Sequence, residues 1–200
     1  MVITISNRYG CGALAVAQLV AGQLGYEYVD EQLPVVVAKR LQTSPEAVES
    51  AEDIGQTMGE RVLRSLELGT PEVRADPGPT FDEECLREVQ DAVREYAAHG
   101  NAVLIGRGAH AILGRKPGVL RVFMLAPREW RVRHIMDNAN VDEKRAAAEL
   151  DRIDRARGEY IRAYYGIDWA DAANYDLTID TSTFGIEGSA AIITSATRAR

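Results

Sequence analysis

Residues 2–15, with the sequence VITISNRYGCGALA, join a short apolar stretch to a glycine-containing turn and then to an alanine-rich segment. The β-branched run from Val2 to Ser6 predicts a buried strand, and the apolar spacing from Ala13 to Leu24 predicts a helix that ends at Gly25. A second short strand is predicted from Tyr26 to Asp30. A strand, a helix and a strand within about thirty residues form a βαβ unit, which predicts an α/β fold with a parallel sheet.

Three interpretations of the glycine turn are open from its residues alone. In the first, Gly10-x-Gly12-x-x-Ala15 is a dinucleotide-binding fingerprint, and Asp30 stands where an acid would bind a ribose hydroxyl, as in an NAD-dependent oxidoreductase with a Rossmann fold. The three residues 7–9 make the turn longer than this fingerprint normally is. In the second interpretation, the glycines have only a structural role in a tight turn.

The third interpretation is a degenerate phosphate-binding loop (Walker A) of the kinase type. Backbone N–H groups of Gly10, Cys11, Gly12, Ala13 and Leu14 would hold phosphate at the N-terminus of the helix. Ala13 then replaces the usual lysine, and Leu14 replaces the serine or threonine that binds magnesium. Another cation would therefore have to neutralise the charge on a transferred phosphate.

The remaining chain predicts further helices and strands around this unit. Residues 31–79 predict two or more short helices that form a flap, one of them beginning at Ser44-Pro45. A capping box at Thr80 and Glu83 begins a helix to about residue 98. Apolar runs, helical spacing and caps then predict strands at 101–106, 120–125 and 177–180, and helices at 127–136, 142–165 and 186–196. We expect one domain over residues 1–200.

The charge of the protein is uneven along the chain. The 200 residues carry a net charge of −7, which argues against a general nucleic-acid or membrane-surface binder. Residues 107–162 hold 13 Lys and Arg against 8 Asp and Glu, a net of +5, so the remainder carries −12. A locally basic segment in an acidic protein suits a compact anionic ligand, whereas a solvated helix face with mixed charge is the alternative.

The number of cysteines and the length of the apolar runs indicate the cellular compartment in which the protein is expected. The two cysteines are far apart in sequence, so they predict neither a disulfide framework nor a zinc site. The N-terminus lacks the features of a signal peptide, and no run of about 18 apolar residues predicts a spanning helix. We therefore expect a cytoplasmic protein.

Arginines follow the predicted strands at the edge where ligands bind in parallel α/β sheets. Arg107 follows a buried strand and suits phosphate, which arginine holds with two parallel hydrogen bonds. Of the three arginines in residues 128–133, helical geometry allows one to face inward, and Arg131 is our choice. Asp154 and Arg157 lie on the long polar helix, either as helix-stabilising charges or as part of a cationic lid that ends at Gly166.

Five segments together resemble the cytidylate kinase-like family of P-loop phosphotransferases, over almost the whole chain. ITISNRYGCG (3–12) resembles the opening ITISRQYGSGG, and YEYVDEQL (26–33) resembles YxDxxL. VLIGRGAHAIL (103–113) is similar to VIVGRxAxxIL, and VFMLAPREWRVRHIM (122–136) to VFxxAPxExRxxRIM. Residues 154–182 resemble the tail D-x-x-R…Y…W…Y-x-L…T-S. The last two segments are specific in combination, and they favour the kinase interpretation over the dinucleotide one.

The resemblance implies a three-layer P-loop fold that transfers the γ-phosphate of ATP to a nucleoside monophosphate or a similar small acceptor. It implies ATP and Mg²⁺ as cofactors, with no metal ligand assigned to the protein. The implied partners are a small-molecule nucleotide and, as an option, a second copy in a homodimer, with no nucleic acid or membrane. The implied site is Gly10 to Leu14 with Arg8 and Arg131 at the ATP, Asp30 and Arg107 at the acceptor, and Arg157, oriented by Asp154, on a lid over residues 142–166.

Departures from the family pattern keep a second function open. Relatives with a similar loop often carry Gly-Arg where this chain has Ala13-Leu14, and cytidylate kinases read Gly-Arg-Asp where it has Gly106-Arg107-Gly108. The alternative is therefore a nucleotide-binding sensor or partner protein that has lost phosphate transfer. Cys11, at a helix N-terminus, is either a thiol of lowered pKa or a small residue that fits the turn. His99, His110 and His134 form no recognisable spacing and receive no role.

Overall fold

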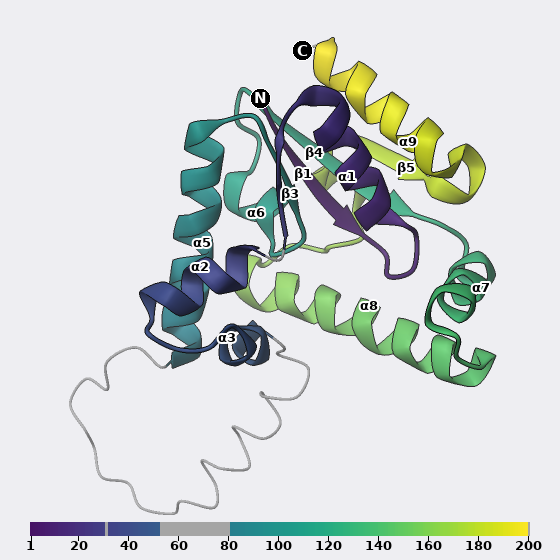
Figure 1. Ribbon diagram of the computed structural model, residues 1–200, viewed down its shortest axis with the longest axis horizontal. Coiled ribbons are helices and arrows are strands. Elements are labelled where there is room, and N and C mark those ends of the chain that lie inside the picture. The colour runs from purple at the N-terminus through teal and green to yellow at the C-terminus, as the bar shows by residue number, and fades with distance from the viewer. Residues whose placement is uncertain (31, 53–80, 200) are drawn as a thin grey trace, which may run out of the picture.

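The protein has one five-stranded, fully parallel sheet in the order β2-β3-β1-β4-β5 (Figure 1). The computed structural model describes residues 1–30, 32–52 and 81–199. The strands are β1 (Val2–Asn7), β2 (Glu27–Val29), β3 (Ala102–Ile105), β4 (Val119–Leu125) and β5 (Leu177–Asp180). The α/β class and the parallel sheet predicted from the sequence are therefore confirmed.

Helices cover both faces of this sheet, which makes three layers. On one face α1 (Ala13–Leu24) packs beside α9 (Thr181–Arg198). On the other lie α5 (Phe81–His99) and α6 (Ala109–Leu113), and α2 (Gln32–Arg40) and α3 (Pro45–Glu52) pack against α5. The chain also contains α7 (Arg128–Ala139), α8 (Glu143–Tyr165) and the 3₁₀ turn η1 (Ala172–Asn174). None of the described helices is long and apolar enough to span a membrane.

Alternate strand residues belong to two different cores, as the pleat of a strand requires. Ile3 and Ile5 of β1 join the core formed with α1 and α9, whereas Val2 joins the core formed with α5. All three side chains are buried because both faces of the sheet are covered. The continuous apolar runs in the sequence reflect this double coverage.

The strand order contradicts the dinucleotide interpretation of the glycine turn. In a Rossmann fold the second strand lies next to the first, which brings its terminal acid close to the glycines. Here β3 lies between β1 and β2, and Val2 to Ile5 pair with Ala102 to Ile105. Asp30 therefore ends a strand that does not neighbour β1.

Most predicted elements are present, and two are additional. The helix predicted at 142–165 is α8, and Asp142 caps it by accepting a hydrogen bond from the N–H of Arg145. The first part of the predicted flap is α2 and α3, with Ser44 accepting from the N–H of Ala47. The rest of the flap (53–79) and the Thr80 cap lie outside the described residues. α6 and η1 were not expected from the sequence, and α9 begins five residues earlier than expected, with a kink at Gly185.

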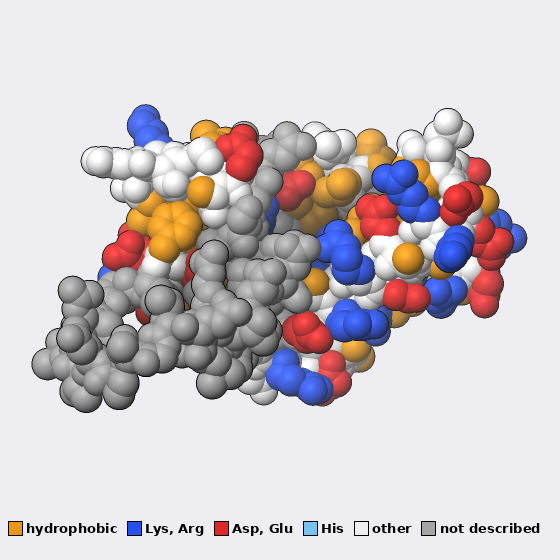
Figure 2. Space-filling view, turned by 90° about the horizontal axis from the view of Figure 1, so that it is seen from below, with side chains coloured by type: hydrophobic (Ala, Val, Ile, Leu, Met, Phe, Trp, Pro, Cys, Tyr) orange, Lys and Arg blue, Asp and Glu red, His pale blue; other side chains and the backbone are white. Residues whose placement is uncertain are grey.

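The segment predicted as a lid is packed against a neighbouring helix. Val132 and Ile135 of α7 form a small core with Ala146 and Leu150 of α8. In Figure 1, α8 runs beneath the ends of the strands. Its outer surface carries interspersed basic and acidic side chains (Figure 2), so the mixed-charge interpretation holds for that face.

Candidate functional site

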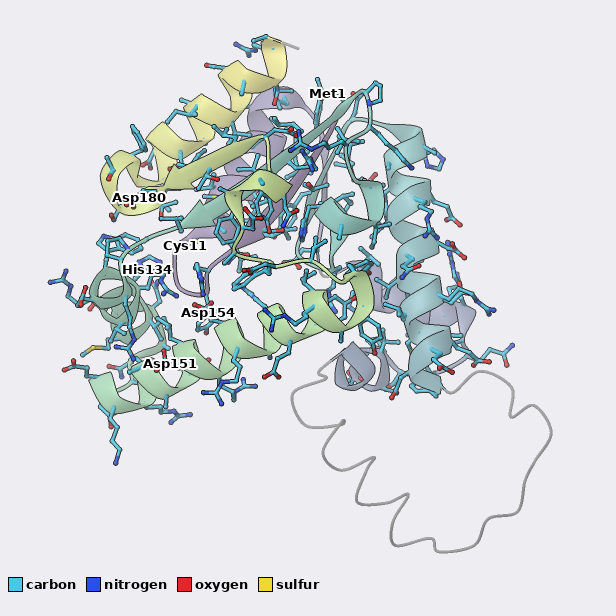
Figure 3. The ribbon with its side chains drawn as sticks, turned by 180° about the vertical axis from the view of Figure 1, so that it is seen from behind. Met1, Cys11, His134, Asp151, Asp154 and Asp180 are labelled. Carbon is cyan, nitrogen blue, oxygen red and sulfur yellow. The ribbon has the colours of Figure 1, made fainter. Side chains whose placement is uncertain are left out.

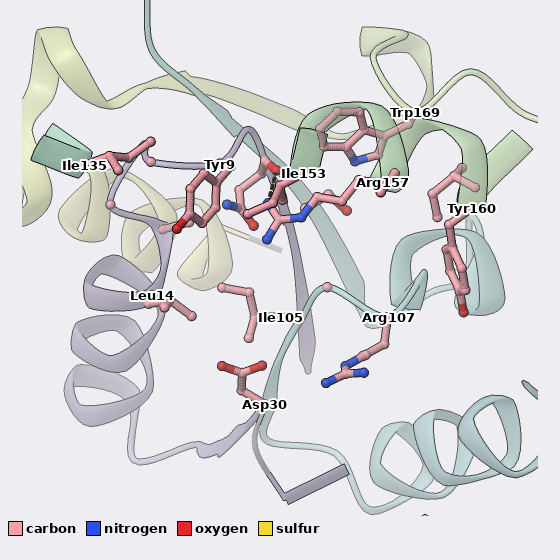
Figure 4. A pocket seen from close by; sticks show the side chains of 18 of the residues that line it. Tyr9, Leu14, Asp30, Ile105, Arg107, Ile135, Ile153, Arg157, Tyr160 and Trp169 are labelled. Atoms are coloured by element: carbon pink, nitrogen blue, oxygen red, sulfur yellow. Dashed lines mark hydrogen bonds between the residues drawn. The ribbon is translucent and has the colours of Figure 1, made fainter. Parts of the chain in front are cut away.

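A cavity of about 730 Å³ lies at the carboxyl ends of β1 and β3 (Figure 4). The loop after β1 forms one wall, the turn between β3 and α6 a second, and α8 a third. The residues that line it include Gly10, Gly12, Ala13, Leu14, Asp30, Arg107, Arg152, Arg157, Tyr160 and Trp169. The loop and two of the predicted arginines, far apart in sequence, are therefore brought to one cavity.

Two glycines shape the loop, because both have left-handed backbone conformations. Gly10 has φ 77° and Gly12 has φ 78°. A Cβ atom at Gly12 would lie 2.6 Å from Cδ1 of Ile186, so a side chain would collide there. Gly12 precedes α1, and no side chain caps the helix. The N–H groups of the first turn thus lack helical partners and border the cavity, an arrangement that suits an anion.

Asp154 and Arg131 hold this loop from behind, in a buried ion pair. Nη1 of Arg131 donates to Oδ2 of Asp154 at 2.8 Å and to the carbonyl of Tyr9 at 3.0 Å. Oδ1 of Asp154 accepts from the N–H of Tyr9 at 2.8 Å, and Arg8 lies 3.4 Å from Oδ2. Figure 3 shows Asp154 between α8 and the loop that carries Cys11. The pair therefore fixes both polar groups of the Tyr9 backbone.

The predicted partnership of Asp154 with Arg157 takes the form of a charge interaction, in which the Asp154 carboxylate raises the pKa of Arg157 against the larger lowering by burial. Asp154 bonds to Arg131, Arg8 and Tyr9, and no hydrogen bond joins it to Arg157. The reason is that α8 presents the two side chains to different parts of the loop. Arg131 faces inward, as predicted, but it and Arg8 lie outside the set of residues that line the cavity.

Arg157 is a cation that contacts the loop within the cavity. Its Nη1 donates to the carbonyl of Asn7 at 2.7 Å, and its guanidinium lies 5.9 Å from the centre of the Tyr9 ring. Among the described residues, no carboxylate forms an ion pair with it. Burial lowers the pKa of Arg157, an expected effect of placing a charge away from water. Arg152 of the same helix also lines the cavity, although the sequence analysis gave it no role.

Arg107 stands on the opposite side, in a strained turn. Its φ is 52°, between Gly106 at 71° and Gly108 at 68°. A Cβ atom at Gly108 would lie 2.7 Å from Cε2 of Tyr165, so the tyrosine occupies the space of a side chain there. In Figure 4 the Arg107 side chain extends toward Asp30. The cavity therefore offers a cation and a carboxylate on this side.

Cys11 is not the reactive thiol that a helix N-terminus suggested. Its side chain is fully buried, its Sγ lies 3.6 Å from the carbonyl of Met124, and it does not line the cavity. Burial raises the pKa of the thiol to about 11. Its own carbonyl accepts a 2.7 Å hydrogen bond from Thr181 at the start of α9, so Cys11 is a structural part of the turn.

Two histidines without a predicted role line the cavity. Nδ1 of His110 lies 2.9 Å from Oγ of Ser6, and its ring stacks on Tyr175. Burial lowers the pKa of His110 to about 4, so it is neutral near pH 7. His134 stacks on the Trp130 ring at 4.9 Å. The contacts of His110 join residues from different elements, which no local spacing indicates, whereas Trp130 and His134 lie four residues apart on α7.

The side chains around the loop do not fit a magnesium ion held by the protein. Mg²⁺ requires oxygen ligands in octahedral geometry. Leu14, at the position of the usual hydroxyl, is apolar and 55% exposed. Among the described residues that line the cavity, Asp30 is the only acid. No group of three or more His, Cys, Asp or Glu in the described part of the chain could hold a metal ion.

A parallel sheet with a glycine loop between its first strand and helix, opening on a cavity at the strand ends, defines the P-loop kinase class of fold. An uncharacterized protein from Eubacterium ventriosum has a similar structure, with a TM-score of 0.72 and 20% identity, covering 100% of this chain and 99% of that one. Shikimate kinase from Bacteroides thetaiotaomicron matches with a TM-score of 0.53 and 15% identity over 99% and 98% of the two chains. At these identities the likeness concerns the fold alone.

The chain belongs to the cytidylate kinase-like family, whose sequence profile matches residues 2–183. The cytidylate kinase of Natronomonas pharaonis is 28% identical, over 100% of this chain and 90% of that protein. The cytidylate kinase of Halobacterium salinarum is 25% identical, over 92% and 83% of the two chains. The cytidylate kinase of Methanocaldococcus jannaschii reaches 36% identity, over 51% of this chain and 58% of that protein.

Proposed function

We propose that the protein is a phosphotransferase that moves the γ-phosphate of ATP to a nucleoside monophosphate or a similar small acceptor. Membership of the cytidylate kinase-like family supports a kinase-like enzyme that binds nucleotides. The observation that carries the proposal is the convergence of the loop, Arg157 and Arg107 on one cavity. We assign the loop to the phosphates of ATP, Arg157 to the transferring group, and Arg107 with Asp30 to the acceptor.

The proposed roles follow from charge and position. A phosphoryl group in transfer carries charge on its equatorial oxygens, and catalysis consists largely of placing cations there. Ala13 supplies no charge, so Arg157, beside the Asn7 carbonyl, is our substitute for the lysine. Asp154 and Arg131 are positioning residues, because they contact the loop backbone from outside the cavity.

A nucleotide-binding protein without transfer activity is the second candidate. The absence of a cation at Ala13 and of a hydroxyl at Leu14 favours it. Such a protein would bind ATP at the same loop and release no ADP.

The expected cytoplasmic location and the option of a homodimer remain part of the proposal. Light scattering of the purified protein tests the dimer.

The test is ADP release from ATP by the purified protein across a panel of nucleoside monophosphates. We expect ADP that depends on one acceptor and that falls by on the order of a hundredfold or more in Arg157→Ala, because a charge acting in the transition state is removed. Arg155→Ala is the matched control, since Arg155 lies exposed on the same helix and outside the cavity.

The same assay separates the candidates. Arg107→Ala is expected to abolish acceptor binding and to leave ATP affinity nearly unchanged. Equal turnover of Arg157→Ala and Arg155→Ala would remove the proposed role of Arg157. ATP binding without ADP release from any acceptor would favour the second candidate.

A further inference from the structure

The phosphate site offers cations in place of the metal ligand that its loop lacks. The described residues that line the cavity carry three arginines against one aspartate, a net of +2 with histidine neutral. Arg157 and Arg152 come from α8, and Arg107 comes from the turn after β3. These three guanidinium groups can hold phosphate oxygens in pairs of hydrogen bonds.

Two candidate oxygen ligands for Mg²⁺, the Ser6 hydroxyl and the Asp30 carboxylate, are occupied or distant from the loop. The Ser6 hydroxyl is buried against Nδ1 of His110 at 2.9 Å. Asp30 follows β2, which is separated from β1 by β3, and two strand spacings place those strand ends about 10 Å apart. A short aspartate side chain and a metal–oxygen bond of about 2.1 Å do not cover that separation. Asp30 also accepts a hydrogen bond from Tyr28 at 3.1 Å.

A magnesium ion on the nucleotide would therefore gain neither the Ser6 hydroxyl nor the Asp30 carboxylate as a ligand. It would instead compete with the guanidinium groups for the same phosphate oxygens. The exposed Leu14 side chain adds an apolar surface where a hydrated ion would need hydrogen-bond partners. Both effects act against a preference for the metal complex.

We infer that this site takes the metal-free polyphosphate of a nucleoside di- or triphosphate at least as well as its magnesium complex. The inference rests on the proposed function, because both require nucleotide phosphates at the loop. It deepens that function by naming the ionic form of the ligand that the site selects. The guanidinium groups of Arg157 and Arg152 take the place of the loop lysine and of the protein-held metal together.

Calorimetric titration with ATP, and separately with ADP, tests this inference in excess magnesium chloride and in EDTA at matched ionic strength. We expect equal affinity, or tighter binding in EDTA. Binding of the magnesium complex more than about threefold tighter, ~0.7 kcal/mol, would overturn the inference. If Asp30→Asn then removed that preference, the metal would belong at Asp30.

Two variants test the reasons behind the expectation. Leu14→Thr returns a hydroxyl at an exposed position, and we expect it to shift the ratio toward the magnesium complex. An unchanged ratio would remove the missing hydroxyl as the cause and would contradict the inference. Arg157→Met is expected to weaken binding of free ATP more than that of the magnesium complex, and Arg155→Met to change neither. An equal effect of Arg157→Met on both forms would also count against it.

Failure of this inference is distinguishable from failure of the proposed function. Tight ATP binding with a clear magnesium preference overturns the inference alone, and ADP release can still be present. The absence of ATP binding in both conditions overturns both, since the loop would then hold no nucleotide.

Discussion

Two ion pairs between α7 and α8 form a matched experiment on burial. Arg131–Asp154 and Arg128–Asp151 both join residues 23 positions apart, and both have a closest N–O distance of 2.8 Å. Their exposure differs, 8% and 9% for the first pair against 50% and 51% for the second, and the buried pair also bonds to the backbone of Tyr9. The two pairs therefore allow a buried and an exposed salt bridge between the same two helices to be compared.

We predict that Asp154→Asn strongly destabilises the protein. Loss of one partner from a buried ion pair typically costs about 3–5 kcal/mol, because the other charge remains away from water. Arg131 keeps its hydrogen bonds to the carbonyls of Ala126 and Tyr9, and an asparagine oxygen can still accept from the Tyr9 N–H. These remaining contacts place the expected loss at the lower end, about 3 kcal/mol.

Urea unfolding measures the effect. With a denaturant slope of about 2 kcal/mol per molar, the midpoint should fall by about 1.5 M. Asp151→Asn should leave the midpoint nearly unchanged, because water already solvates both charges of that pair. Similar midpoint shifts in the two variants, or a shift below about 0.5 M in Asp154→Asn, would refute the assignment of a stabilising role to the buried pair.

Three further predictions concern pH, backbone geometry and thiol chemistry. The pKa of His110 is about 4 in the folded protein against 6.5 in the unfolded chain, so the unfolded chain takes up the proton first and stability is lost as pH falls through that window. Between pH 7 and about pH 4.5, the free energy of unfolding of His110→Phe should therefore fall by about 2 kcal/mol less than that of the native protein, as measured by urea titrations at each pH. Gly108→Ala should lower the thermal midpoint more than Gly166→Ala, because both have nearly equal φ, 68° and 67°, but only the first collides with Tyr165, and equal midpoints would contradict this. Iodoacetamide should label Cys11 in the native protein only as fast as it unfolds, since burial raises the thiol pKa to about 11, and rapid labelling followed by mass spectrometry would show the thiol to be accessible.

The elements with strong periodicity or β-branched runs could be predicted from the sequence. β1 and α8 have such patterns, and their observed bounds lie within a residue or two of the expected ones. α6 has only five residues, too few for a helical period to appear. The early start of α9 had a local sign, since Asp180 caps it by accepting from the N–H of Ser182, but Gly185 interrupts the pattern.

The site could be predicted only in part, because its contacts are long-range. Parallel-sheet geometry places the end of β1 beside the end of β3, so the loop and Arg107 could be expected to lie together. The pairing of Asp154 with Arg131 depends on how α8 crosses α7, which no local pattern specifies. The contact of His110 with Ser6 spans 104 residues and likewise required the folded chain. The roles of these residues in phosphate transfer stay predictions.

The contact of the Thr181 hydroxyl with the N-terminal loop affects when, during synthesis, this loop can reach its final structure. It donates to the carbonyl of Cys11 at 2.7 Å and to that of Leu125 at 3.1 Å, which joins the start of the last helix to the N-terminal turn. During synthesis the loop leaves the ribosome before the residues that hold it in place, because Arg131, Asp154 and Thr181 follow it in that order. We therefore expect a growing chain to acquire affinity for phosphate late, after residue 181 has been released, because the loop takes its final shape only once these later residues are in place.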